Sequence, residues 1–263
     1  MAGLALAAVF VFGVALRTAA STGDHTAPDQ VAGVERFRAR TTRLYDEAKA
    51  QYAASTNVTL AWQFTRACFD LADAATNDAQ RAAVAREGIS VGRDLVRRQP
   101  TLAAAHYYLA MNLGQLARTR TLGALGIVSE MERVFSRARE LNETFDYAGP
   151  DRCLGLLYRD APGWPLSVGN RAKAETHLRR AVTLSPDYPE NQLNWLESRL
   201  RWEDPGRARP EFETTARLLA QARLAFVGQH WEAAWADWDQ RWSAVQGRMN
   251  ERTGARTPPD NAR

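Results

Sequence analysis

Apolar residues recur every three or four positions along most of the chain, with polar and charged residues between them. This spacing puts the apolar side chains on one face of a helix, so it predicts a series of amphipathic helices. Turn signals such as Asn77, Asp78 and Pro100 separate them. The pattern predicts a first helix over 34–54 and a last helix over 229–249. Between them it predicts four helical hairpins: 58–75 with 78–98, 101–116 with 128–141, a pair of helices on both sides of 161–170, and 189–202 with 210–227.

One predicted hairpin carries a sequence motif. Its first helix contains the run Leu154-Gly155-Leu156-Leu157-Tyr158, and its second contains Ala174, Leu178 and Ala181 before Pro186. The small residues allow two helices to approach closely, and the proline ends the second helix. This is the tetratricopeptide signature without its leading tryptophan and with leucine in place of phenylalanine. The sequence therefore predicts an all-α, tetratricopeptide-like solenoid of helical hairpins with extended intra-repeat loops and a C-terminal capping helix.

Two successive hairpins contain long turns between their helices. Residues 119–126 form one turn, and residues 161–170 form the other. Gly155 and Ala174 are 19 positions apart, against about 12 in the standard repeat. Turns of this kind lie on the same edge of a solenoid, and insertions on one edge commonly build a binding face. We therefore expect 122–126 and Trp164 to rim a ligand cavity or a partner face.

Composition narrows the function classes. The 263 residues are 45% hydrophobic and 24% charged, and the net charge of +4 comes mostly from arginines scattered along helices. Nucleic-acid binding, which concentrates positive charge on one face, is not indicated. No catalytic motif, cofactor fingerprint or metal-ligand spacing occurs, so we expect a non-enzyme without cofactor or metal. Cys68 and Cys153 are expected to be buried free thiols, with a disulfide as the alternative.

The N-terminus indicates export. Residues 4–16 form an uninterrupted apolar run, which is short for a membrane-spanning helix, and Thr18-Ala19-Ala20 follows as a small-residue cleavage site. Residues 1–20 are predicted to be a signal peptide or an uncleaved N-terminal anchor, and both alternatives place the rest of the chain in the periplasm or on its membrane. Residues 21–33 are predicted as a linker, 34–249 as the tetratricopeptide-like domain and 250–263 as a disordered tail.

Several polar and aromatic residues are candidates for binding a ligand or partner. Asn112 follows Tyr108 by one helical turn, and with Arg118 the pair could bind a carboxylate or carbonyl. Trp164 lies between glycine and proline, so it is either held out for a ligand or folded onto the core as a loop anchor. Asp187, Tyr188 and Asn191 lie in the turn before a helix, where capping is the alternative explanation.

Four tryptophans share one face of the last helix. Trp231, Trp235, Trp238 and Trp242 are spaced four, three and four apart. The stripe is either the apolar face that packs on the preceding hairpin or an interface with a partner or a second copy. Docking of this helix on a membrane is the third alternative. It is less favoured because Glu232, Asp237 and Asp239 make the polar face acidic, whereas membrane-surface helices usually have a basic one.

Three segments resemble the T-component family of tripartite ATP-independent periplasmic (TRAP) transporters. They are Ala104–Gly114 (AAHYYLAMNLG), Leu154–Asn170 (LGLLYRDAPGWPLSVGN) and Ser185–Asn191 (SPDYPEN). The resemblance implies a periplasmic protein that partners a solute-binding protein, holds a small organic or hydrophobic ligand, and assembles into trimers. The alternative function is a general tetratricopeptide scaffold in cell-envelope assembly, with the tryptophan stripe as its contact.

Overall fold

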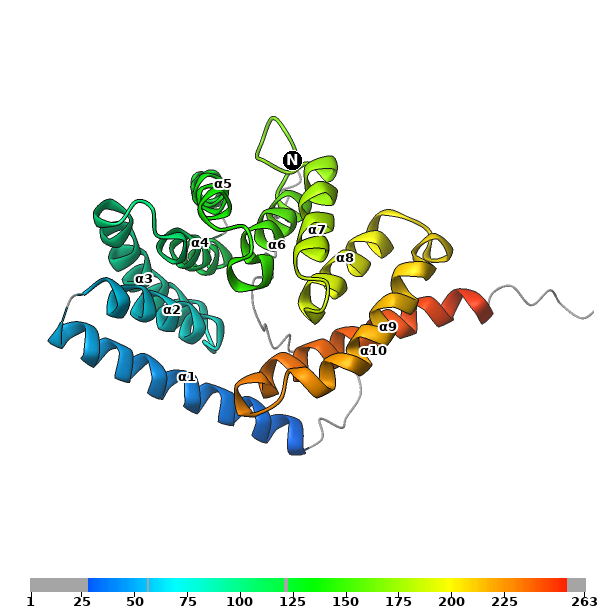
Figure 1. The fold of residues 1–263 in the computed structure, drawn as a ribbon, viewed down its shortest axis with the longest axis horizontal. Coiled ribbons are helices and arrows are strands. Elements are labelled where there is room, and N and C mark those ends of the chain that lie inside the picture. Colours follow the sequence, from blue (N-terminus) through cyan, green and yellow to red (C-terminus); the bar gives the residue numbers. More distant parts are fainter. Residues whose placement is uncertain (1–27, 56, 121–122, 255–263) are drawn as a thin grey trace, which may run out of the picture. The chain divides into compact units, whose positions relative to one another are not determined.

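A computed structural model describes residues 28–55, 57–120 and 123–254 of the chain (Figure 1). The predicted leader, 1–20, lies outside these residues. None of the helices in the described part combines the length and the hydropathy needed to cross a bilayer. The helices are α1 (Pro28–Ala54), α2 (Val58–Asp73), α3 (Asp78–Arg98), α4 (Ala103–Arg118), α5 (Ala124–Leu141), α6 (Phe145–Asp160), α7 (Arg171–Leu184), α8 (Pro189–Trp202), α9 (Arg209–Ala225) and α10 (Glu232–Gly254), with short 3-10 turns η1 (Pro205–Ala208) and η2 (Gln229–Trp231).

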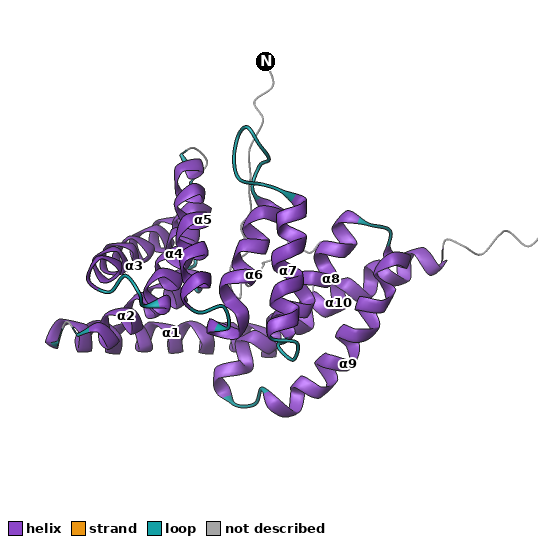
Figure 2. Cartoon of the chain, turned by 45° about the horizontal axis from the view of Figure 1, so that its top comes forward, coloured by secondary structure: helices purple, strands orange, loops and turns teal. Residues whose placement is uncertain are grey.

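The helices form two compact units, which meet in the sequence between Ser185 and Pro186. In the first unit, α2 and α3, α4 and α5, and α6 and α7 form three successive helical hairpins, and α1 packs on α2. Short loops join most of these helices, whereas a longer loop projects between α6 and α7 (Figure 2). The predicted all-α solenoid of helical hairpins is confirmed. The second unit holds α8, α9 and α10, so the region predicted as one domain over 34–249 comprises two units.

Small residues set the close helix packing in the first unit. Helix α4 is buried from Ala104 to Ala117, because α2, α3 and α5 surround it. A Cβ added at Gly88 of α3 would lie 2.4 Å from Oδ1 of Asn112.

Cys68 and Cys153 are buried free thiols, so the disulfide alternative does not hold.

Gly155 makes the equivalent contact in the third hairpin, and replacing it tests how tightly that hairpin is packed. A Cβ there would lie 2.6 Å from Cγ of Leu178 and 3.1 Å from its backbone nitrogen. Gly155→Ala should therefore lower the free energy of unfolding by about 1–3 kcal/mol, measured by urea denaturation. Gly126→Ala is the control, because nothing lies within 4 Å of a Cβ in that exposed helical position. We expect it to stabilise by up to about 1 kcal/mol; equal effects of the two substitutions would contradict the packing argument.

The second unit is built around aromatic side chains of α10. Trp235 and Trp238 pack with Leu193 of α8 and Leu219 and Ala222 of α9. Further along α10, Val245 and Met249 pack with Leu196 and Leu200. The last helix therefore buries its apolar face within its own unit.

Some element boundaries differ from those predicted. Helix α5 begins at Ala124, because Gly123 adopts a left-handed conformation (φ 83°) that ends the turn early. The long turn predicted over 119–126 is thus shorter, and Leu122 lies outside the described residues. The helix predicted over 101–116 starts later, because α4 begins at Ala103 after Leu102, without a side-chain cap.

Both ends of the helical region are longer than predicted. Helix α1 starts at Pro28, inside the predicted linker, in keeping with the preference for proline in a first helical turn. Helix α10 continues to Gly254, five residues into the predicted tail. No proline interrupts 250–254, so the backbone hydrogen bonds of the helix can continue there.

Candidate binding surfaces

The first helices of the three hairpins, α2, α4 and α6, share a face that carries exposed and half-buried aromatic and charged side chains. The Trp62 ring stacks on Tyr108 with centroids 6.1 Å apart, and Phe145 meets the same tyrosine edge-on at 6.0 Å. The guanidinium of Arg66 lies 5.9 Å from the Tyr108 ring centroid, and the Arg66 side chain is 56% exposed. We call this surface the inner face; it presents a cation above an aromatic floor.

A left-handed turn of three residues opens α6 beside this floor. Asp146, Tyr147 and Ala148 have φ values of 50°, 55° and 60°. The conformation costs about 1–2 kcal/mol for each residue with a Cβ, so surrounding contacts must hold it. Its result is to bury Ala148 completely and to leave Tyr147 42% exposed at the edge of the inner face.

Arg152 supplies the contacts that hold this turn. One of its nitrogens, Nη1, donates to the backbone oxygens of Asp146 and Tyr147, both at 3.2 Å. The other, Nη2, donates to Oδ2 of Asp146 at 2.8 Å, and the Tyr107 hydroxyl donates to the same oxygen at 2.7 Å. Burial raises the pKa of Tyr107, and the Asp146 charge adds to this, so the hydroxyl remains a donor.

A carboxylate lies beside the exposed cation of the inner face. Oδ2 of Asp70 lies 3.6 Å from Nε of Arg66 on the same helix. Enclosure by protein atoms raises the pKa of Asp70 to about 6; Arg66 opposes the shift, whereas Asp73 and Asp146 add to it. Within the described ranges, no three His, Cys, Asp or Glu side chains gather closely enough to hold a metal ion. Because it combines an aromatic floor with charges of both signs, the inner face can contact apolar and polar groups together.

The structure separates the three residues predicted on α4. Tyr108 forms part of the aromatic floor. Asn112 is fully buried and donates to the backbone oxygens of Thr65 and Tyr108 at 2.9 and 2.8 Å. Arg118 donates to Oδ1 of Asp73 at 3.0 Å and to Oε1 of Gln115 at 3.1 Å. Asn112 and Arg118 thus use their donors to join helices.

Trp164 lies on a loop that projects from the third hairpin. Its side chain is 89% exposed, and Leu166, two residues later, is 62% exposed. The alternative that Trp164 anchors the loop on the core therefore does not hold. The amide of Gly169 donates to the Pro162 oxygen at 2.8 Å, which closes the loop at its base. The loop holds the indole out in solvent, which is the other of the two alternatives, and its binding role stays a prediction.

The turn before α8 contains the other predicted polar residues. Asp187 is exposed, and Asn191 is 1% exposed on the first turn of the helix. Tyr188, not Asp187, occupies the cap position and makes no side-chain cap hydrogen bond, and Pro189 opens the helix. The Tyr188 ring packs edge-on against Phe226 and Trp238, with centroids 5.8 and 5.7 Å away. Tyr188 therefore packs into the core of the second unit.

The tryptophan stripe of α10 is used inside the second unit. Trp235 and Trp238 are 9% and 1% exposed, and Trp242 stacks on Phe212 at 4.8 Å. Trp231 is half-buried and packs against Phe226. A partner interface through the whole stripe would require α10 to leave the unit, so the packing alternative describes these residues.

A buried charge cluster joins α10 to α8. Arg241 lies 2.8 Å from a carboxylate oxygen of Glu190, 2.8 Å from one of Glu197 and 3.2 Å from one of Asp237. It also donates to Oδ1 of Asn194 at 2.7 Å. One cation therefore serves three carboxylates. Burial raises the pKa of Asp237 to about 7, Arg241 opposes this, and the neighbouring glutamates add to it.

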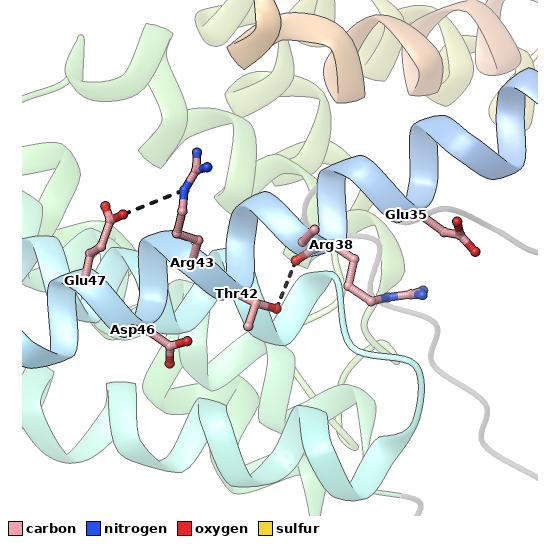
Figure 3. Close-up of a pocket in the computed structure, with 7 residues that line it drawn as sticks. Glu35, Arg38, Thr42, Arg43, Asp46 and Glu47 are labelled. Carbon is pink, nitrogen blue, oxygen red and sulfur yellow. Dashed lines mark hydrogen bonds and ion pairs between the residues drawn. The ribbon is translucent and has the colours of Figure 1, made fainter.

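A depression of about 600 Å³ lies on α1 (Figure 3). Nε of Arg43 pairs with Glu47 at 3.7 Å along the helix, and Thr42 donates to the Arg38 backbone oxygen at 2.9 Å. Because one helix supplies all the residues that line it, the depression is an open surface and we assign no site to it. The lining residues are Glu35, Arg38, Ala39, Thr42, Arg43, Asp46 and Glu47.

Comparisons with known proteins agree on the architecture. A profile of the family described as "Regulator of microtubule dynamics protein 1-3" matches residues 29–144, which is 116 of 263 positions. A crystal structure of a thermophilic TPR protein from Thermus thermophilus superposes with a TM-score of 0.51 at 20% identity, over 80% of this chain and 98% of that chain. No curated protein matches the sequence. The chain thus has the tetratricopeptide type of fold.

Proposed function

We propose that this chain is a non-catalytic helical-repeat protein that binds a segment of another protein on its inner face. The observation that carries the proposal is the exposed Arg66 above the aromatic floor, beside a Tyr147 that a left-handed turn holds in solvent. Solenoids of helical hairpins use such extended faces for binding. Arginine and aromatic residues are also the commonest side chains at the energetic centres of protein interfaces.

The charges of the inner face favour a segment with both apolar and polar groups. Arg66 can donate to a carboxylate or carbonyl of the partner, since its contact with Asp70, at 3.6 Å, is long for a hydrogen bond. Asp70 and Asp146 can accept from donors that flank that group. The ring of Tyr147 adds apolar area at little cost in side-chain entropy.

The finer proposal concerns the partner and the compartment. We propose an exported protein that meets a periplasmic solute-binding protein, as the T-components of TRAP transporters do. The sequence resemblance over Leu154–Asn170 and the apolar run over 4–16 support this proposal, and the run lies outside the described residues. Trimer formation and a small organic ligand belong to the same proposal. The general scaffold in envelope assembly remains the alternative.

Affinity capture of the tagged full chain from its native host tests the proposal. Arg66→Ala and Tyr147→Asn should each reduce the recovered partner by about tenfold, since each removes about 1–2 kcal/mol of contact. Asparagine at 147 tolerates the left-handed backbone, so the turn is kept. Arg97→Ala is the matched control, because that side chain is 72% exposed on α3, away from the inner face.

The identity of the captured protein separates the alternatives. A periplasmic solute-binding protein supports the transporter role, and envelope-assembly proteins support the scaffold role. Equal capture by wild type and both inner-face variants, with unchanged circular dichroism, would remove the inner face as the binding site.

A further inference from the structure

We propose that one edge of the first unit docks on the surface of a lipid bilayer, with Trp164 and Leu166 inserted at the interface. The edge consists of the first turn of α5 and the loop between α6 and α7. It is separate from the inner face, so partner binding and membrane docking can be tested independently.

The tip of the loop between α6 and α7 is apolar and open to solvent. Gly163, Trp164, Pro165 and Leu166 are consecutive, and all four are exposed. Residues 161–170 contain no charged side chain. A run of exposed apolar residues is unfavourable for a soluble surface unless something covers it. This tip therefore requires an apolar contact.

A second apolar projection lies on the same edge. Leu125, in the first turn of α5, is 43% exposed, and residues 124–129 contain no charged side chain either. Figure 2 shows the start of α5 and the loop between α6 and α7 at the upper edge of the first unit. Three large apolar side chains are exposed on this edge, namely Leu125, Trp164 and Leu166. In the rest of the described part of this unit there are two more, Leu44 and Tyr147.

The loop is already ordered for docking. The amides of Leu166 and Ser167 donate to the Gly163 oxygen at 3.0 and 3.2 Å, and the amide of Asn170 donates to the Tyr158 oxygen at 2.8 Å. A Cβ at Gly169 would lie 2.1 Å from the backbone oxygen of Ala161, so the two sides of the loop are in close contact. Little conformational entropy is then lost when the tip inserts.

Three features favour a bilayer over a pocket in a partner protein. Two apolar projections on one edge can enter a continuous interface together, whereas a protein pocket generally receives one anchor. Tryptophan is the side chain most enriched at membrane interfaces. Exposed cations flank the edge: Arg120 follows α4, and Arg171 and Lys173 lie in the first turn of α7. Lys173 also lies 3.5 Å from Glu132. Such cations attract anionic headgroups.

The tryptophan distribution allows a site-specific test in the full chain. Trp164 is the only exposed tryptophan of the eight; the other seven, at 62, 195, 202, 231, 235, 238 and 242, are buried or half-buried. The chain is mixed with vesicles of phosphatidylethanolamine and phosphatidylglycerol whose acyl chains carry bromine, which quenches tryptophan emission at short range. We expect quenching in the wild type and its loss in Trp164→Phe, which still binds.

Binding itself is measured by sedimentation with the same vesicles. Replacing Leu125, Trp164 and Leu166 together by serine should lower the bound fraction at least about fivefold. The control replaces Leu224 and Val227 by serine, because these side chains, 86% and 61% exposed, lie in the second unit. The control should bind like the wild type, and circular dichroism should show folded protein in both.

Two outcomes would overturn the proposal. Vesicle binding without quenching of Trp164 would show that another segment, such as the apolar run over 4–16, makes the contact. The second outcome is that the wild type neither binds vesicles nor shows quenching, while Trp164→Ser loses a captured protein partner. That result would show that the tip fills a protein pocket.

Discussion

Arg241→Met should lower the free energy of unfolding of the second unit by about 3–5 kcal/mol, because it leaves three clustered carboxylates without their shared cation. Glu190 and Asp237 are 22% and 9% exposed, so water can solvate their charges only in part. Urea denaturation followed by tryptophan emission measures the loss. Six of the eight tryptophans belong to this unit, since only Trp62 and Trp164 lie before Pro186.

Two further variants separate the charge effect from a general loss of packing. Arg217→Met changes an exposed arginine on α9 and should be near neutral. Asp237→Asn removes one carboxylate while Arg241 keeps Glu190 and Glu197. An Arg241→Met protein as stable as the wild type at pH 8 would contradict the cluster's importance.

The Asp237→Asn variant also has an expected pH dependence. The pKa of Asp237 is about 7 in the fold, against about 3.9 unfolded. The unfolded chain therefore loses this proton first, and the wild type loses stability as the pH rises from about 4 to about 7. Asp237→Asn should be more stable than the wild type by about 1–2 kcal/mol at pH 8, and the gain should shrink toward pH 4. A gain independent of pH would contradict the shift.

Arg152→Ala should destabilise the first unit by about 3 kcal/mol, because the Arg152 guanidinium donates to two backbone oxygens of the left-handed turn and to the carboxylate of Asp146. The side chain is 8% exposed, so its loss also leaves a cavity. Hydrogen exchange of the amides over 145–149 measures local opening, and urea denaturation measures the global effect.

Arg152→Lys is the informative comparison, because it keeps the charge but not the forked donor geometry. It should recover the pairing with Asp146 only in part, so the exchange at 145–149 should remain fast. Arg137→Ala, which alters a side chain 44% exposed on α5, serves as the surface control. Slow exchange at these amides in Arg152→Ala would show that packing of Ala148 alone holds the turn.

The sequence predicted the architecture well, because hydrophobic spacing and turn residues act locally. The bounds of α8 match at both ends, since Pro189 starts that helix and the apolar pattern stops at Trp202. Errors came where glycine conformation or the reach of a helix past its last apolar residue decided the boundary. Gly123 shortened one turn by its positive φ, which composition alone does not reveal.

The candidate site was harder to predict, because exposure depends on the packing of neighbouring helices. For Trp164, flanked by glycine and proline, the sequence left two alternatives, projection or anchoring on the core, and its exposure decides for projection. Arg66 and Tyr147 were missed. Their signal was weak: an arginine one turn after Trp62, and a left-handed turn without glycine. Asn112 was expected on a binding surface, but its amide bonds to backbone oxygens between helices.

The contact between Gly88 and Asn112 has a consequence for how this sequence can change over evolution. A Cβ at 88 would fall 2.4 Å from the asparagine oxygen, so position 88 cannot gain a side chain while asparagine stays at 112. A lineage that acquires alanine at 88 must first, or at once, shorten residue 112. Related sequences should therefore show covariation between positions 88 and 112, which lie on neighbouring hairpins. Where both positions have changed, restoring only one of the two original residues should be more harmful than restoring both.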